Sequence, residues 1–242
     1  MTNELRRTFH RELDDVTKAI VVLGELVIQS IPRATAALLN SDLGAAESLI
    51  RADVDLDARS TEIEEQCYRL LALQQPMAGD LRKITSALRI NGEIERSGDL
   101  VVNICKGARR ILGHPIDPVI RGVVSRMADQ AQAQFSRAIE AYATTDVPLA
   151  SALSDMDDLL DRLQTELIQA IFESHRLGRI DLQVAVQLAV IARFYERIGD
   201  HAVNLGERTR YIVTGNLPEH AGAKHQPPTP PDDDQSTRPV GQ

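Results

Sequence analysis

The sequence predicts an all-α protein built from two tandem three-helix bundles, and three observations lead to this prediction. Apolar residues recur at three- and four-residue steps through most of the 242 residues, which is the spacing of amphipathic helices. Aromatic residues make up only 3% of the chain, so Leu, Ile, Val and Ala must form the core. A motif that begins at Glu95 is written again from Glu196, which indicates an internal repeat.

Six helices are expected, because turn residues interrupt the helical pattern at regular places. In the first half, Asp42, Pro76 and Gly113 mark the breaks, and the helices should cover about residues 5–40, 43–74 and 78–112. In the second half, the breaks at Asp146 and Gly178 leave helices over about residues 118–143, 147–176 and 180–214. We therefore expect the first repeat at 1–114 and the second at 115–216. Residues 217–242 are rich in Pro and Asp, and we expect them to form a disordered tail.

Charge and cysteine usage exclude several classes of protein. The net charge is −8, which disfavours a nucleic-acid partner because such partners require a basic face. The two cysteines, Cys67 and Cys105, are far apart and form no metal-binding or disulfide spacing, so both are expected in the core. The longest apolar run, 19–23, is much shorter than the ~20 residues of a membrane span. A cytoplasmic protein without a membrane span is expected.

The repeated motif places an oxygen-rich stripe on one helix face. Glu95, Asp99 and Asn103 are four residues apart, and at an offset of 101 they match Glu196, Asp200 and Asn204. Acidic neighbours at this spacing repel one another, and a glycine inside a helix, as between Glu95 and Asp99, costs about 1 kcal/mol. Both unfavourable features occur twice, which indicates a functional reason for them.

The preceding helix of each repeat carries a second pair of carboxylates. These pairs are Asp53 with Asp57 and Asp157 with Asp161. If each helix pair folds as an antiparallel hairpin, Asp57 and Glu95 are centred on Pro76, as are Asp53 and Asp99. The corresponding pairs of the second repeat are centred between residues 178 and 179. Four carboxylates should therefore face one another in each repeat: Glu95, Asp99, Asp53 and Asp57 in the first, Glu196, Asp200, Asp157 and Asp161 in the second.

Carboxylates that face one another need a cation or basic side chains to neutralise them. A bound metal is the simplest solution, and an all-oxygen ligand set favours Mg²⁺, Mn²⁺, Fe or Ca²⁺ over a structural zinc site. The identity of the metal, Zn included, stays open. The alternative is surface ion pairing with nearby arginines such as Arg96 and Arg197, which would leave the clusters without a ligand. His201 lies beside Asp200, but a single histidine is more often a packing residue.

These motifs together resemble those of the PhoU family, and in particular its actinobacterial members. The resemblance covers about residues 5–214. The motifs that carry it are Leu73-Gln74-Gln75-Pro76-Met77-Ala78, Asp80-Leu81-Arg82, Glu95-Arg96-Ser97-Gly98-Asp99 and the second acidic motif at residues 196–204. It implies metal ions bound by the eight carboxylates named above. It also implies a negative regulator of phosphate uptake and of the phosphate-starvation response. Such regulators contact the ATPase subunit of the phosphate ABC transporter and a phosphate-sensing histidine kinase.

Two residues depart from the family pattern. Ser97 stands where the family usually has Ile, and Gln183 follows Asp181-Leu182 where the first repeat has Arg82. The serine affects how side chains pack at the first carboxylate cluster. The glutamine removes an arginine that would contribute positive charge near the second cluster.

The leading hypothesis is a non-enzymatic signalling adaptor that contacts these partner proteins, and two alternatives to it stay open. A carboxylate-bridged di-metal oxidase would need Glu-x-x-His pairs, and no Glu of this sequence is followed by His at the third position. A metal-free helical scaffold differs from the leading hypothesis only in whether the carboxylate clusters bind an ion. The expectation is a protein that is not an enzyme and that forms a homodimer.

Overall fold

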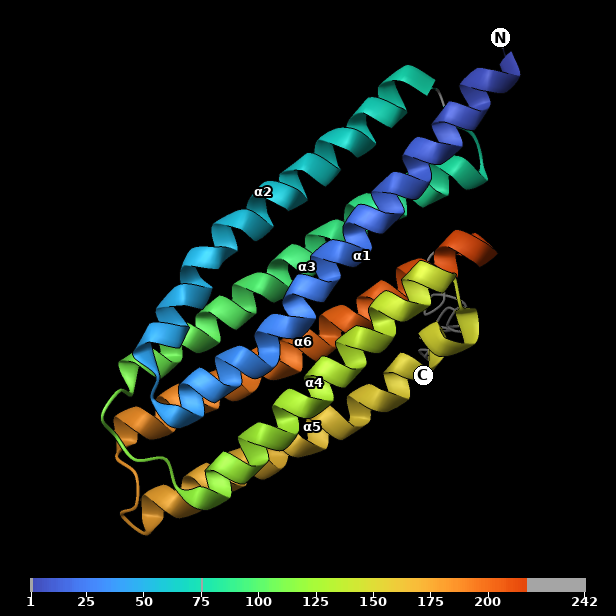
Figure 1. Cartoon of the computed structure of the whole chain (residues 1–242). Helices are drawn as coiled ribbons and strands as arrows, with labels where there is room; N and C mark the ends of the chain where they lie inside the picture. The colour runs from blue at the N-terminus through green and yellow to red at the C-terminus, as the bar shows by residue number, and fades with distance from the viewer. Residues whose placement is uncertain (1, 75, 217–242) are drawn as a thin grey trace, which may run out of the picture.

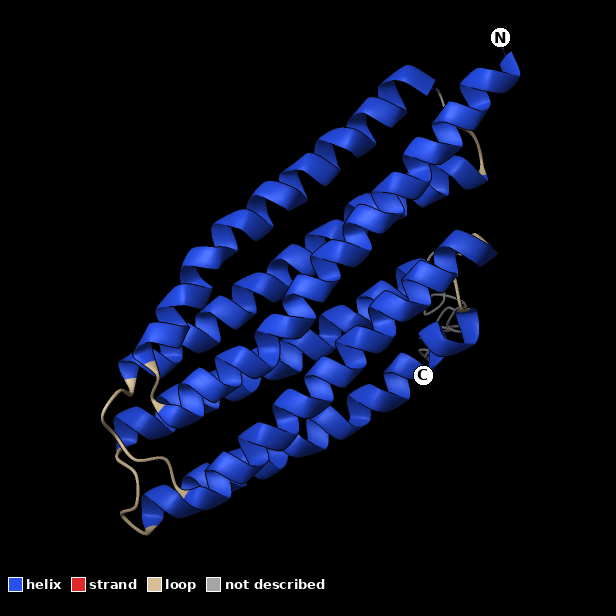
Figure 2. Cartoon of the chain, in the orientation of Figure 1, coloured by secondary structure: helices blue, strands red, loops and turns tan. Residues whose placement is uncertain are grey.

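The computed structural model describes residues 2–74 and 76–216, and this part of the chain is almost entirely helical, without strands (Figures 1 and 2). The predicted all-α class and the number of helices are confirmed, and most helix ends lie within one turn of their predicted places. The predicted tail at 217–242 lies outside the described residues. The helices are α1 (Thr2–Asn40), α2 (Leu43–Gln74), α3 (Gly79–Arg110), α4 (Pro118–Thr144), α5 (Val147–Arg176) and α6 (Leu182–Thr214).

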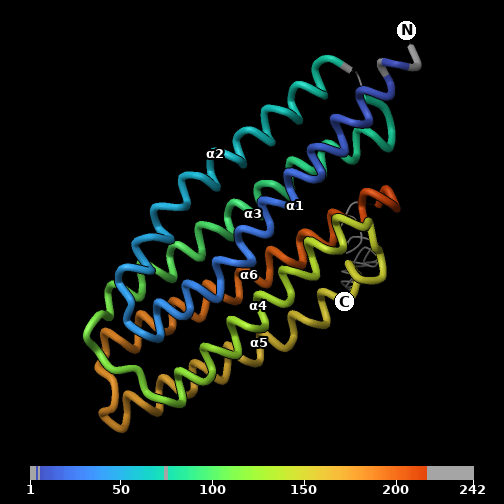
Figure 3. The backbone as a smooth tube through the Cα atoms, in the orientation of Figure 1, coloured from blue at the N-terminus to red at the C-terminus, as the bar shows by residue number. Residues whose placement is uncertain are grey.

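The six helices form two three-helix bundles that lie side by side along a common axis (Figures 1 and 3). Helices α1 to α3 make the first bundle and α4 to α6 make the second. Close backbone approaches between the bundles run from α3 to α6 and from α1 to α4, whereas α2 and α5 approach only helices of their own bundle. Therefore α2 and α5, the helices with the second set of acidic pairs, lie on the outside.

Side-chain caps explain where several helices begin. Asp117 accepts a hydrogen bond from the backbone N–H of Val119 at 2.8 Å, and Asp181 accepts one from Val184 at 2.8 Å. Asp146 caps α5 in the same way. These bonds satisfy backbone donors that have no partner inside the helix. Gly215 ends α6 in the left-handed conformation, with φ of 74°, which glycine adopts at little cost.

The repeat extends through most of each bundle but uses two offsets. The buried positions Ile20 and Ile31 of α1 correspond to Val124 and Phe135 of α4, an offset of 104. The same offset relates α2 to α5, so that Asp53 corresponds to Asp157. Between α3 and α6 the offset is 101, because the stretch from Asp57 to Glu95 is three residues longer than the stretch from Asp161 to Glu196.

A single aliphatic core runs through both bundles. Residues 6–40 of α1 are long and apolar enough to cross a membrane by length and composition alone. However, Ile20, Leu23 and Val27 of this helix are completely buried against the other helices. The apolar face of α1 is therefore already covered by protein, and its composition is explained by its place in the core.

Buried polar contacts also join the two bundles. The hydroxyl groups of Thr35 and Tyr195 share a hydrogen bond of 2.7 Å, and both side chains are buried. Within the second bundle, just before α4, the buried carboxylate of Asp117 accepts hydrogen bonds from Ser174 and Arg179, each 3.1 Å long. The cap at Val119 and these partners hold the pKa of Asp117 below its usual value. The two bundles thus form one folded unit.

Two glycine substitutions test the tightness of helix packing. A Cβ at Gly206 would lie 2.7 Å from the carbonyl oxygen of Ala150 and 2.6 Å from Leu153 Cδ1, whereas a Cβ at Gly122 would meet nothing within 4 Å. We expect Gly206→Ala to lower the free energy of unfolding by about 1–3 kcal/mol through overpacking. Gly122→Ala should raise it by about 0.5–1 kcal/mol, because Ala is the better helix former. Urea unfolding of both variants checks this, and equal effects would contradict the close approach at Gly206.

Candidate metal-binding carboxylate clusters

The first cluster consists of Asp53 and Asp57 on α2 and Glu95 and Asp99 on α3, and the structure brings these carboxylates together. Burial, Asp57 and Asp99 raise the pKa of Asp53 to about 6, while Lys106 lowers it. The pKa of Glu95 is raised by burial and then by Asp99 and Asp57. The four groups therefore sense one another across the two helices, as the hairpin argument predicted.

The second cluster consists of Asp157 and Asp161 on α5 and Glu196 and Asp200 on α6, and it is less open. Burial raises the pKa of Asp157, and Asp161 and Asp200 contribute to the increase. The pKa of Asp200 is raised by burial and by Asp161, and lowered by Arg193 and Arg197. Three of the four carboxylates thus interact.

Glu196 has a different environment from its counterpart Glu95. It is buried, and its Oε1 forms an ion pair with Arg193 on the same helix. Gly92 is the equivalent of Arg193 in the first bundle, so the first cluster has no arginine at this place. The other oxygen, Glu196 Oε2, is buried without a hydrogen-bond partner in the described residues. A buried carboxylate oxygen without a partner is costly, and a cation would satisfy it.

Glycine is what allows the acidic helices to approach. A Cβ at Gly199 would lie 2.5 Å from Leu160 Cδ2 and 2.8 Å from Asp157 Oδ1. At Gly98 the corresponding distance is 3.0 Å to Leu56 Cδ1. A larger residue at Gly199 would force Leu160 and Asp157 to shift, and one at Gly98 would displace Leu56 less strongly. The glycines inside the acidic motifs are therefore explained by packing at the clusters.

The residues fit a hard metal ion in chemistry, but not yet in geometry. All eight donors are carboxylate oxygens, and burial together with neighbouring carboxylates raises the pKa of Asp53, Glu95, Asp157 and Asp200. Within the described residues, however, no three acidic, histidine or cysteine side chains converge closely enough to hold one ion. Metal binding at either cluster would require carboxylates to rotate toward one another.

His201 has a structural role at the contact between the two bundles. Its Nδ1 shares a hydrogen bond of 2.9 Å with Ser97 Oγ on α3, and its Nε2 lies 3.8 Å from Glu93 Oε2. Burial lowers the pKa of the imidazole to about 4, so it is neutral at physiological pH. The departure at Ser97 is thereby explained, because its hydroxyl meets a histidine of the other bundle. At the equivalent positions the repeat has Ile198 and Leu100, both buried and apolar.

Sequence reasoning missed Gln134, a fully buried side chain at the second cluster. Its Nε2 donates to Asp157 Oδ1 at 3.0 Å and lies 3.3 Å from the carbonyl oxygen of Gly199. A comparison of the two repeats at the offset of the acidic motif, 101, does not align α1 with α4. These helices align at an offset of 104, and only that alignment shows which residue of α1 corresponds to Gln134. At offset 104 the counterpart of Gln134 is Ser30.

The chain matches the PhoU domain twice, over residues 20–108 and 124–209. It belongs to the PhoU family. The two matches begin 104 residues apart and end 101 residues apart, in agreement with the two offsets seen in the structure. The duplication predicted from the acidic motif is thus confirmed.

Individual PhoU proteins resemble the chain over most of its length. A phosphate-specific transport system accessory protein PhoU homolog 1 from Mycobacterium tuberculosis is 36% identical over 215 residues, covering 88% of this chain and 96% of that protein. A PhoU homolog from Rhizobium meliloti is 31% identical and covers 87% of this chain and 89% of its own length. The crystal structure of PhoU from Pseudomonas aeruginosa has a TM-score of 0.80 at 29% identity, covering 86% of this chain and 100% of that chain.

The raised pKa of Asp53 makes the stability of the metal-free protein depend on pH. Between 3.8, the ordinary value, and about 6 the folded state binds more protons than the unfolded state, so stability falls as the pH rises through this window. We expect Asp53→Asn to gain stability relative to wild type across it and to level off near pH 7. The gain should be about 1 kcal/mol, because partial exposure reduces the effect. Chemical unfolding from pH 4 to 7, after chelation, measures the difference. A variant that is less stable than wild type at pH 7 would contradict the crowding of carboxylates.

The hydrogen bond between Ser97 and His201 can be tested with a double-mutant cycle. Ser97→Ile and His201→Leu each remove this hydrogen bond, and we expect each single substitution to lower the free energy of unfolding by about 1–2 kcal/mol. Ser97→Ile with His201→Leu installs the residues that the repeat uses at the equivalent positions. This double variant should recover most of the loss. Additive effects of the single substitutions would show that the two side chains are not coupled.

Proposed function

We propose that this PhoU-family chain is an accessory regulator of phosphate transport that holds metal ions in its two carboxylate clusters and acts as an adaptor between proteins. In this role it restrains phosphate uptake and the phosphate-starvation response. Its partners would be the ATPase subunit of the phosphate ABC transporter and the phosphate-sensing histidine kinase, both reached from the cytoplasm. Relatives described as phosphate-specific transport system accessory proteins, which match 87–88% of the chain, support the regulatory part.

The observation that carries the metal-binding part is the crowding of carboxylates on facing helices. At the first cluster four acidic groups meet, and their mutual repulsion contributes to the raised pKa values of Asp53 and Glu95. At the second cluster, a buried oxygen of Glu196 lacks a partner among the described residues. A metal ion would supply positive charge and direct oxygen coordination at both places. Asp53 and Asp57 would then be tied to α3, and Asp157 and Asp161 to α6.

A non-enzymatic role is the better interpretation of these sites. A ferritin-like oxidase builds its centre from Glu-x-x-His pairs, which this sequence lacks. The imidazole nearest to a cluster, that of His201, is buried and hydrogen-bonded to Ser97. The clusters would therefore stabilise and shape the helical surface that partners contact. A homodimer is part of the proposal, and sedimentation of the purified chain would test it.

Elemental analysis of the purified protein tests the metal-binding proposal. We expect Fe, Mn or another hard metal in the wild type, and its loss from a variant with Glu95, Asp99, Glu196 and Asp200 changed to Ala. A matched control changes the same number of exposed acidic residues away from the clusters: Asp14, Glu62, Glu65 and Asp129. The control should keep the metal, with unchanged helicity by circular dichroism. Metal in neither wild type nor control would favour the metal-free scaffold.

A strain that lacks the chain tests the regulatory proposal. We expect phosphate uptake and starvation-response transcription to rise in phosphate-rich medium, because the restraint is removed. Re-expression of wild type should restore the restraint, and the four-alanine cluster variant should fail to restore it. Full restoration by the cluster variant would separate regulation from the carboxylates.

A further inference from the structure

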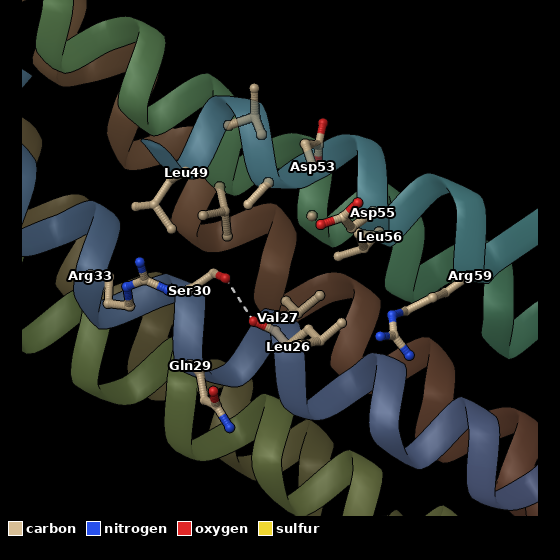
Figure 4. A pocket seen from close by; sticks show the side chains of 14 residues that line it. Leu26, Val27, Gln29, Ser30, Arg33, Leu49, Asp53, Asp55, Leu56 and Arg59 are labelled. Carbon is tan, nitrogen blue, oxygen red and sulfur yellow. Dashed lines mark hydrogen bonds between the residues drawn. The ribbon is translucent and has the colours of Figure 1, made fainter. Parts of the chain in front are cut away.

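A hollow of about 190 Å³ lies between α1 and α2 in the first bundle (Figure 4). The apolar hollow of about 180 Å³ in the second bundle lies elsewhere, between α5 and α6. Its floor is aliphatic, formed by side chains such as Val27, Leu49 and Leu56. Arg33 and Arg59 lie at opposite ends of it (Figure 4). The duplication provides an internal comparison, because every lining residue has a counterpart in the second bundle.

Glutamine side chains bridge α4 and α5 at the corresponding place in the second bundle. Gln130 donates from Nε2 to the carbonyl oxygen of Met156 at 2.9 Å, and Gln134 reaches the carbonyl oxygen of Leu153. Both bonds cross from α4 to α5. In the first bundle the counterparts are shorter or apolar: Leu26 for Gln130, Ser30 for Gln134 and Ala52 for Met156. The Ser30 hydroxyl donates to Leu26 of its own helix.

At the outer edge of the groove, too, a polar bridge is present in the second bundle and missing from the first. In the second bundle Arg126 of α4 forms an ion pair with Glu166 of α5. The counterpart of Arg126 is Val22, an apolar side chain that is 50% exposed. Among the side chains that the structure describes, no hydrogen bond or ion pair connects α1 to α2. Polar side chains therefore bridge α4 and α5, whereas no such bridge spans the groove between α1 and α2 in the described residues, where the hollow has an aliphatic floor and charged residues around it.

The cationic ends of the hollow lack partners of their own. Neither Arg33 nor Arg59 forms an ion pair with a described residue. Arg137, the counterpart of Arg33, pairs with Glu140 at 2.8 Å, and the counterpart of Arg59 is the buried Leu163. On the wall formed by α2, Asp53 lies close to Gly98 and the first cluster, and Asp55 is exposed beside the hollow.

We infer that the groove between α1 and α2 docks an amphipathic helix of a partner protein, which inserts one large apolar side chain into the hollow. Carboxylates about one turn to either side of that side chain would pair with Arg33 and Arg59. This inference rests on the proposed adaptor function and names the surface it uses. The pattern of one apolar anchor between acidic residues follows from the aliphatic floor and the two unpaired guanidinium groups.

The size of the hollow supports a side chain over a metabolite. Small-molecule pockets usually enclose about 300–1,000 Å³, more than this hollow offers. The chain's own residues 217–242 are a poor occupant by composition, because Leu217 and Val240 are their only large aliphatic residues. The open groove beside the hollow instead suits an element that lies along α1 and α2.

A filled variant tests the inference with residues that the protein already uses. Ser30→Gln with Ala52→Met places the second bundle's side chains in the first, and both are good helix formers. A displayed library of helical peptides, selected on wild type, provides a probe that requires no known partner. We expect selected peptides to carry one large apolar residue flanked by Asp or Glu. They should bind the filled variant at least ~10-fold more weakly, the effect of losing one buried side chain.

Charge reversal provides the matched control. Arg33→Glu should weaken the selected peptides at least ~10-fold, whereas Arg137→Glu makes the same change at the equivalent position and should leave binding unchanged. Circular dichroism confirms that each variant is folded. Selection of no peptide, or equal binding of the selected peptides to wild type and filled variant, would overturn the inference.

The purified transporter ATPase subunit and the cytoplasmic part of the kinase separate this inference from the proposed function. Binding of either protein to wild type that the filled variant loses supports both. Equal binding to wild type and filled variant keeps the proposed function and overturns the groove. If sedimentation shows that the filled variant instead converts a dimer to a monomer, the occupant is a second copy of the chain and the inference is wrong.

Discussion

The close approach of an acidic helix to a glycine on the next helix is the contact on which both carboxylate clusters depend. Asp157 can lie beside Asp200 only because α5 packs directly onto Gly199, where a Cβ would collide with Leu160 and with Asp157 itself. The packing is driven by the aliphatic stripe that α5 shares with the core, including Leu153, Leu160 and Leu167. Apolar burial therefore supplies the free energy that holds like charges together.

Duplication gave the two bundles the same frame but left them with different local chemistry. Glu95 is affected by the three other carboxylates of its cluster, whereas Glu196 is held by Arg193. Gln134 fills the space beside Asp157, and Ser30 leaves the corresponding space beside Asp53 open. Each difference results from one or two side chains on an unchanged backbone arrangement. Such substitutions alter a groove or a charge without altering the core, so two bundles of the same fold can have different functions.

The fold was largely predictable from sequence because apolar spacing and turn residues act locally. Pro76, Gly113 and Asp146 interrupt the pattern where the helices end or begin, so six helices could be placed without knowing any long-range contact. The pairing of Asp53 with Asp99 was also predictable, since an antiparallel hairpin fixes which residues lie level with each other. The partners of Ser97 and Glu196 were not, because they depend on rotamers and on how the two bundles pack. The hollow beside Ser30 could not be predicted for a similar reason, because it depends on how the side chains of α1, α2 and α3 pack against one another.

Helix α2 belongs both to the first cluster and to the open groove, and this shared membership links the two proposals physically. Asp53 lines the hollow and also faces Asp99, so the position of α2 relative to α3 sets the position of the groove wall relative to α1. An ion bound between α2 and α3 would fix that wall, and one that dissociates would release four repelling carboxylates that push α2 outward. Among the described side chains no polar bridge joins α1 to α2, so this movement is opposed by apolar packing alone. Metal occupancy and the affinity of a docked helix would then be thermodynamically coupled, each ligand favouring the same position of α2.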